Sequence, residues 1–163
     1  MLRPANTLVT SYTFVSPLDP ALDTEAEEEL PDGTKKRTFP DRWQRYLDGT
    51  GECPVRAGEK PTVFTLRHLR TAERALLDRY VARAVSDSSE SLAACIAAFA
   101  VALESVENLS DAEGKAVKAE FDVDTNGIYP VRIASQKTLD AVGHDVAVSV
   151  GRRVIERLSL GPS

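Results

Sequence analysis

Hydrophobic residues change their spacing partway through residues 61–84, "PTVFTLRHLRTAERALLDRYVARA". The segment "TVFTLRHL" is rich in β-branched and large apolar residues and predicts a short strand. From Thr71 onward the apolar residues recur at helical spacing, at Leu76, Leu77, Tyr80, Val81 and Ala84. Thr71 suits the N-cap, and Glu73 lies where a carboxylate stabilises the positive end of the helix dipole. The pattern predicts a strand followed by a helix whose apolar face meets a core or an interface.

A second helix is predicted to begin after "SDSSE", where Asp87 with Glu90 resembles a capping box and Ser88 is an alternative cap. Its apolar stripe consists of Leu92, Ile96, Phe99, Leu103 and Val106. Flanking alanines make residues 91–103 apolar around nearly the whole helix, which is typical of a helix buried on most sides. We therefore expect either the central core helix or a helix that packs against another subunit.

Two further helices are predicted near the C-terminal end. The segment "GIYPVRI" favours a short strand, and "QKTLDAV" favours a helix that Ser135 caps and Gly143 ends. The last helix is predicted over residues 145–158, with one apolar face formed by Ala147, Val150, Val154 and Leu158.

The first sixty residues lack this regularity. A strand is predicted over residues 8–15, and a short helix in "PDRWQRYLDG", with Pro40 near its start and Gly49 at its end. The remainder is dense in Pro, Gly and Asp. We predict an α+β fold: a mainly helical body of about three to four helices with short strands in residues 61–163, and a long irregular N-terminal arm in residues 1–60.

Composition narrows the choice of partner. The chain has 163 residues, 42% of them hydrophobic and 28% charged, and its formal net charge is -5. A negative chain argues against DNA or an anionic membrane as the main partner, because both select a basic surface. Cys53 and Cys95 stand alone, which fits a reducing compartment. The N-terminal residues lack a signal-like apolar run, and the longest uncharged stretch is shorter than the roughly 20 residues that span a bilayer. We expect synthesis in the cytoplasm and no membrane partner.

Charge is segregated into blocks along the chain. Residues 21–32 carry six carboxylates and no cation, residues 35–83 hold twelve basic against six acidic side chains, and residues 104–124 hold seven acidic against two basic. Such blocks either form solvated surfaces or pair copies of the chain by complementary potentials. The basic block includes Arg67, Arg70, Arg74, Arg79 and Arg83. A nucleic-acid patch is one interpretation, but acidic residues interrupt it. We favour pairing with the acidic run, residues 25–29, of the same or an adjacent chain.

Candidate chemistry is weak. The string "DVDTNG", residues 122–127, matches the first half of a calcium-binding loop, but Ile133 stands where the bidentate glutamate belongs, so a plain turn is favoured. Cys53 and His68 could in principle form a nucleophile pair, although neither has a local signature, and His144 is the other histidine. We predict no catalytic, cofactor-binding or metal site and expect the protein not to be an enzyme.

Three segments of the chain, "YTFVSPLDP", "TVFTLRHLRTAER" and "SQKTLDAVGHDVAVSVGRRVIERLSL", together resemble small proteins encoded among the head and tail genes of tailed bacteriophages. The resemblance is carried mostly by residues 61–80 and 135–160. It implies a structural or assembly protein of a phage particle, located in the virion and made in the host cytoplasm, whose partners are copies of itself and other virion proteins such as portal, capsid or tail.

Within that class, the resemblance favours a neck or head-to-tail connector that forms a homo-oligomeric ring. A capsid decoration or cement protein and a tail assembly chaperone are the alternatives. From a different class, a small cysteine-dependent hydrolase built on Cys53, His68 and a carboxylate stays open.

Overall fold

The computed structural model describes residues 11–25, 27–84, 88–125, 127 and 129–159. These residues form an α+β fold with five helices and short antiparallel strands, about 40% helical, so the predicted fold class is confirmed. They divide into two compact units. Pro17–Pro61 make up the smaller unit, and the described residues up to Ser16 and from Thr62 onward make up the larger one.

The larger unit is built on a three-stranded antiparallel sheet. Its central strand is β4 (Val63–Arg67), with β1 (Ser11–Val15) on one side and β5 (Leu103–Glu107) on the other. Phe14 of β1 lies opposite Phe64 of β4. The sequence predicts one arm over the first sixty residues, but strand β1 in that range pairs with β4 and groups with the larger unit.

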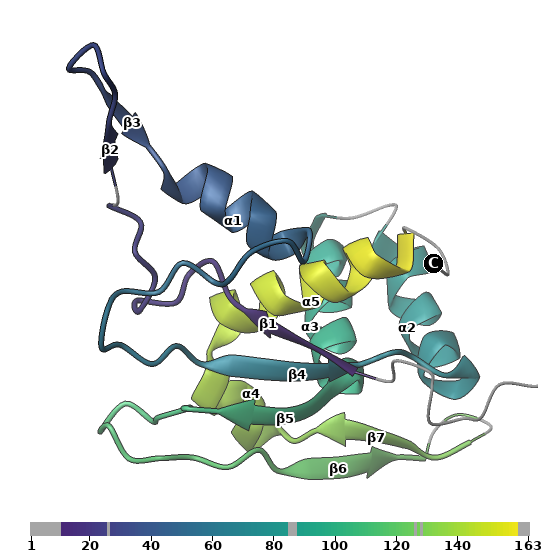
Figure 1. Cartoon of the computed structure of the whole chain (residues 1–163). Coiled ribbons are helices and arrows are strands. Elements are labelled where there is room, and N and C mark those ends of the chain that lie inside the picture. Colours follow the sequence, from purple (N-terminus) through teal and green to yellow (C-terminus); the bar gives the residue numbers. More distant parts are fainter. Residues whose placement is uncertain (1–10, 26, 85–87, 126, 128, 160–163) are drawn as a thin grey trace, which may run out of the picture. The chain divides into compact units, whose positions relative to one another are not determined.

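Helix α3 (Ser88–Ala102) is the central core helix of the larger unit, which is the first of the two alternatives expected for it. Figure 1 shows α3 and α5 (His144–Ser159) on one side of the sheet. Phe99 of α3 meets Phe64 of the sheet edge-on, with ring centroids 5.6 Å apart. Its neighbours Ala98, Val101 and Ala102 are at most 1% exposed. The chain itself buries this side of the helix.

The two core helices α3 and α5 approach each other most closely at Gly151. A Cβ atom added there would overlap the carbonyl oxygen of Cys95 and lie 2.5 Å from its carbonyl carbon. Only glycine lets the two backbones come this close, since real Cβ atoms essentially never lie closer than 3.0 Å to another heavy atom.

The predicted second helix was wrong in its C-terminal part. The helix ends at Ala102, and the chain continues directly into β5, where Leu103 pairs with Leu66 and Val106 with Phe64. Leu92, expected in the buried stripe, is 41% exposed. Phe99 of that stripe is buried, and Ala94, Ala98 and Ala102 are buried as well. Small side chains allow the close packing seen at Gly151.

Other predicted elements of the larger unit are confirmed. Helix α2 (Thr71–Ala84) begins where expected, and α5 covers the last predicted helix. Strands β6 (Phe121–Asp124) and β7 (Val131–Ala134) form a hairpin, and α4 (Gln136–Val142) follows it. The side chain of Ser135 accepts a hydrogen bond from the backbone N–H of Thr138, which confirms the predicted cap. The caps proposed around residue 87 lie outside the described residues.

The smaller unit contains a two-stranded hairpin and one helix. The hairpin consists of β2 (Glu27–Glu29) and β3 (Lys35–Arg37), and α1 (Phe39–Leu47) confirms the helix predicted in "PDRWQRYLDG". Pro40 stands in its first turn, and Gly49, with a φ of 76°, follows its end. The hairpin strands were not predicted, because charged residues are poor strand formers.

Candidate functional site

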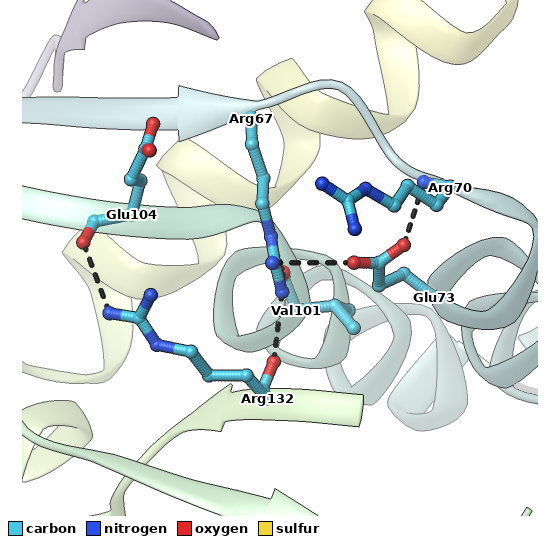
Figure 2. A network of polar contacts seen from close by, with 6 residues as sticks. All are labelled: Arg67, Arg70, Glu73, Val101, Glu104 and Arg132. Carbon is cyan, nitrogen blue, oxygen red and sulfur yellow. Dashed lines mark hydrogen bonds and ion pairs between the residues drawn. The ribbon is translucent and has the colours of Figure 1, made fainter. Parts of the chain in front are cut away.

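Arg67, at the end of β4, is the centre of the polar network in the larger unit (Figure 2). Its Nε and Nη2 donate to the carbonyl oxygen of Val101 at 3.1 and 2.9 Å, and Nη2 also donates to the carbonyl oxygen of Arg132 at 3.0 Å. Its Nη1 lies 3.3 Å from Oε1 of Glu73. One guanidinium therefore joins β4 to the end of α3, to β7 and to α2.

Glu73 uses its second carboxylate oxygen to cap α2. Its Oε2 accepts a hydrogen bond of 2.7 Å from the backbone N–H of Arg70, and its side chain is only 8% exposed. The proposed N-cap role of Thr71 is thus wrong: Thr71 is the first residue of the helix, and Arg70 is the capped position. A carboxylate near the first turn stabilises the positive end of the helix dipole, as the sequence predicted for Glu73.

Arg132 extends the network along the hairpin β6–β7. Its guanidinium lies 3.6 Å from the centre of the Phe121 ring, and its Nη2 donates to the carbonyl oxygen of Glu104 at 3.5 Å. Together with the bond from Arg67 to the Arg132 carbonyl, this contact holds β7 beside β5. The network has a structural role, since its donors are aimed at backbone carbonyls and ring faces within the protein.

The acidic run has a basic partner next to it in the chain, within the hairpin of the smaller unit. Its pairing with the central arginines of an adjacent chain stays a prediction. In the hairpin, Glu27, Glu28 and Glu29 lie opposite Arg37, Lys36 and Lys35, in that order. The carboxylate of Glu27 is 3.8 Å from Nζ of Lys35. The neighbouring basic run is reached through a short turn, whereas Arg67 is held by Glu73 in the larger unit.

The candidate nucleophile pair is not assembled within either unit. Cys53 belongs to the smaller unit and His68 to the larger. Burial, with a smaller effect from the Asp19 carboxylate, raises the pKa of the Cys53 thiol to about 11, opposite to the shift that activates a cysteine. The His68 ring lies 5.5 Å from that of Tyr12, and His144 is an exposed residue at the start of α5.

The calcium-like string adopts strand structure in its first half. Asp122 and Asp124 belong to β6 and lie opposite Ile133 and Val131 of β7. An extended strand cannot wrap its carboxylates around one ion as a calcium loop does. Among the residues that the structure describes, no group of three or more His, Cys, Asp or Glu side chains is placed to hold a metal ion.

Helix α1 carries an aromatic stripe that the sequence analysis missed. Phe39, Trp43 and Tyr46 recur at spacings of four and three, so they lie on one side of the helix. The ring centroids of Phe39 and Trp43 are 5.9 Å apart, and those of Trp43 and Tyr46 are 5.2 Å apart. No residue of α1 is buried. The signal was present in "FPDRWQRYL" as three aromatic residues at helical spacing.

Two hollows flank the hairpin β6–β7 in the larger unit. One, of about 150 Å³, lies between α2 and the hairpin and is lined mainly by apolar groups, with Arg79 and Asp124 among its polar ones. The other, of about 460 Å³, is an open groove between α3 and the hairpin, where Ala93, Ile96 and Ile133 contribute to the lining. Neither brings together groups with an evident catalytic arrangement.

The chain was compared with protein-family models, curated proteins and solved structures, and none of them matches it. The described residues form an α+β protein, and in its larger unit the network around Arg67 has a structural role. Within the described ranges, no helix is both long and apolar enough to cross a membrane.

Proposed function

We propose that this protein is a non-enzymatic structural component of a tailed-phage virion, a neck or head-to-tail connector whose copies form a ring. The assignment to a phage particle is based on the resemblance of residues 61–80 and 135–160 to small proteins of phage head and tail gene clusters. Its partners would be copies of itself and the portal, capsid or tail proteins next to the ring. It would be made in the bacterial cytoplasm and located in the virion.

The aromatic stripe of α1 is the observation that carries a role in subunit contacts. Aromatic residues and arginine are enriched in protein interfaces, where large flat side chains bury much area at low entropic cost. Helix α1 combines Phe39, Trp43 and Tyr46 with Arg42 and Arg45, and its three aromatic side chains are half-buried, so each keeps area for a further contact. A helix of this composition gains most by packing its stripe against a neighbouring subunit.

The polar residues of the larger unit support a contact-based role over chemistry. The network around Arg67 is directed at backbone carbonyls and at Glu73. The raised pKa of Cys53 weakens the hydrolase alternative, because the thiolate is the nucleophile and is scarce near neutral pH. No second function is favoured by a specific observation.

The proposal is tested by measuring the protein in purified virions, together with its mass in solution. A connector should be present in mature particles at a low copy number, that of a single ring. The purified chain should form a ring with the same number of subunits. A copy number close to that of the capsid protein would instead indicate a decoration protein. Absence from mature virions would exclude both roles and favour a transient tail assembly chaperone.

The aromatic stripe provides a matched pair of variants. Trp43→Ala should weaken ring formation at least about tenfold, as expected for an aromatic residue at the centre of an interface. Glu59→Ala, at an exposed position of the same unit, should leave it unchanged. Equal ring formation by the two variants would contradict a role of α1 in the contact.

A further inference from the structure

The hairpin of the smaller unit separates charge by strand. All three residues of β2 are glutamates, and all three of β3 are basic. Glu27, Glu29, Lys35 and Lys36 are exposed. Among the described residues the sheet has two strands only, so β2 and β3 are both edge strands, one acidic and one basic.

The turn between the strands fixes their register. The backbone N–H of Leu30 donates to the carbonyl of Thr34 at 2.7 Å, that of Gly33 donates to Leu30 at 2.9 Å, and Gly33 has a φ of 84°. This is a three-residue loop, a type I turn followed by a left-handed glycine, which "PDG" suits. Asp32 reinforces it by accepting from the N–H and hydroxyl of Thr34.

The same register decides which backbone groups point away from the hairpin. Leu30 and Thr34 form a hydrogen-bonded pair, and such pairs alternate with non-bonded pairs along an antiparallel ladder. The pairs Glu29 with Lys35 and Glu27 with Arg37 are therefore of the second kind. Their N–H and C=O groups face outward, along an acidic edge on β2 and a basic edge on β3.

We propose that the acidic edge of β2 pairs, as an antiparallel strand, with the basic edge of β3 from a second copy of this chain. The inference rests on the proposed function in that copies of the chain assemble. Each glutamate strand would then lie between two basic strands. An isolated two-stranded hairpin without apolar side chains is marginal in water, and additional strands stabilise it.

Charge excludes the symmetric alternatives. Pairing β2 with the β2 of another copy would place glutamates beside glutamates, and pairing β3 with β3 would place lysines beside lysines. Like charges directly opposite each other destabilise a pair of strands, whereas opposite charges stabilise it. The existing contacts of Lys35 with Glu27 and of Lys36 with Asp41, at 3.8 and 3.1 Å, are exposed ion pairs and leave this preference in place.

A contact between two different edges is directional. It repeats head to tail, and the rotation between copies decides whether it closes into a ring or continues as a chain. The contact should weaken as salt is raised from 50 to 500 mM, because exposed charges are screened over about 8 Å at physiological ionic strength.

Charge-swapped full-length variants test the pairing by native mass spectrometry and light scattering. E27K/E28K/E29K makes both edges basic, and K35E/K36E/R37E makes both acidic. Each of these two variants, on its own, should self-associate at least about tenfold more weakly than wild type. An equimolar mixture of the two should associate as wild type does, because basic edges then meet acidic ones. The matched control E59K/E107K/E113K makes the same charge change as the first variant at exposed glutamates outside the hairpin and should associate normally.

The variant carrying all six substitutions separates contacts between chains from contacts within one chain. It restores opposite charges inside its own hairpin, so the hairpin should form, and it should assemble with itself. It should not co-assemble with wild type, because wild-type β2 would then meet an acidic β3. Free mixing of the two, or unchanged association of the single swaps, would overturn the pairing.

Failure of this inference is distinguishable from failure of the proposed function. A wild-type chain that stays monomeric at about 100 μM would overturn the pairing even if the protein is found in virions. Conversely, association that responds to the swaps as described, in a protein absent from virions, would retain the pairing and exclude the connector. Rings that form equally in all variants would retain the connector and reject the hairpin as its contact.

Discussion

Replacing Gly151 with alanine tests the packing of the larger unit at its tightest point. Gly151 is buried in the middle of α5, where glycine is otherwise unfavourable by roughly 0.5–1 kcal/mol relative to alanine. If α5 were free of close neighbours, G151A would therefore stabilise the protein. The position of Cys95 predicts the opposite result.

The magnitude follows from the geometry of the crossing. The new methyl carbon would overlap the Cys95 carbonyl oxygen and lie 2.5 Å from its carbon and 3.1 Å from its Cα. These are backbone atoms of a buried helix, so no flexible side chain can yield, and the helices must separate. Overpacking of this kind costs about 1–3 kcal/mol or more. After the gain in helix propensity, we expect a net loss of about 2 kcal/mol in the free energy of unfolding.

Urea and thermal denaturation measure this loss. For a chain of this size, about 2 kcal/mol lowers Tm by roughly 4–8 °C. Gly127→Ala is the control, because a Cβ there would meet only Nη2 of Arg79 at 3.6 Å and the carbonyl of Tyr129 at 3.8 Å, which are ordinary contacts. It should change stability by less than about 0.5 kcal/mol. A G151A variant as stable as wild type would refute the close crossing of α3 and α5.

Three further outcomes are expected. Arg67→Ala should lower the free energy of unfolding by about 3 kcal/mol in urea titrations, because Oε1 of Glu73 and the carbonyl oxygens of Val101 and Arg132 lose the Arg67 donor. Arg67→Lys should recover only part of this loss. Ser135→Ala removes the hydrogen bond from the Thr138 N–H and should lower the free energy of unfolding by about 1 kcal/mol, whereas Ser135→Asp should retain the cap. An alanine variant as stable as wild type would contradict the capping role of Ser135. The Cys53 pKa is raised to about 11, so the alkylation rate of its thiol should rise about tenfold per pH unit from pH 8 to 10. Mass spectrometry measures this rate, with glutathione as the reference thiol. A plateau near pH 9 would contradict the raised pKa.

Elements with local end signals could be predicted from the sequence. Ser135 and Gly143 bracket α4, and Pro40 and Gly49 bracket α1, because a cap, a proline ring or a left-handed glycine acts on its own turn. Such signals depend only on neighbouring residues. Their accuracy therefore does not require knowledge of the tertiary structure.

The junction of α3 and β5 could not be predicted in this way. No glycine, proline or cap separates Ala102 from Leu103, and the apolar spacing continues through Val106. The helix ends because Leu103 and Val106 pair with Leu66 and Phe64 of β4. Pairing with a strand some forty positions earlier in the chain overrides a local helical pattern.

The acidic run finds a partner close by in the chain, and this preference has an entropic reason. Both the neighbouring Lys35–Arg37 run and the more distant arginines carry the charge that could pair with the acidic run. Composition alone does not tell which of them pairs with it. Closing the short loop that ends at Gly33 fixes few residues, and its "PDG" sequence already favours the turn. Reaching Arg67 would order a much longer segment for exposed ion pairs that each contribute little.

The charged groups of the two units have different roles: those of the larger unit stabilise the fold, and those of the hairpin are available for contacts between copies of the chain. In the larger unit the Arg67 guanidinium and the Glu73 carboxylate are largely buried and directed inward, so breaking them costs stability. In the hairpin Glu27, Glu29, Lys35 and Lys36 are exposed and contribute little to folding, since surface ion pairs are worth at most about 1 kcal/mol each. Yet these six charges determine which strand edges can lie side by side. Substitutions in the two regions should therefore affect different properties: stability for Arg67, and the direction and salt dependence of association for β2 and β3.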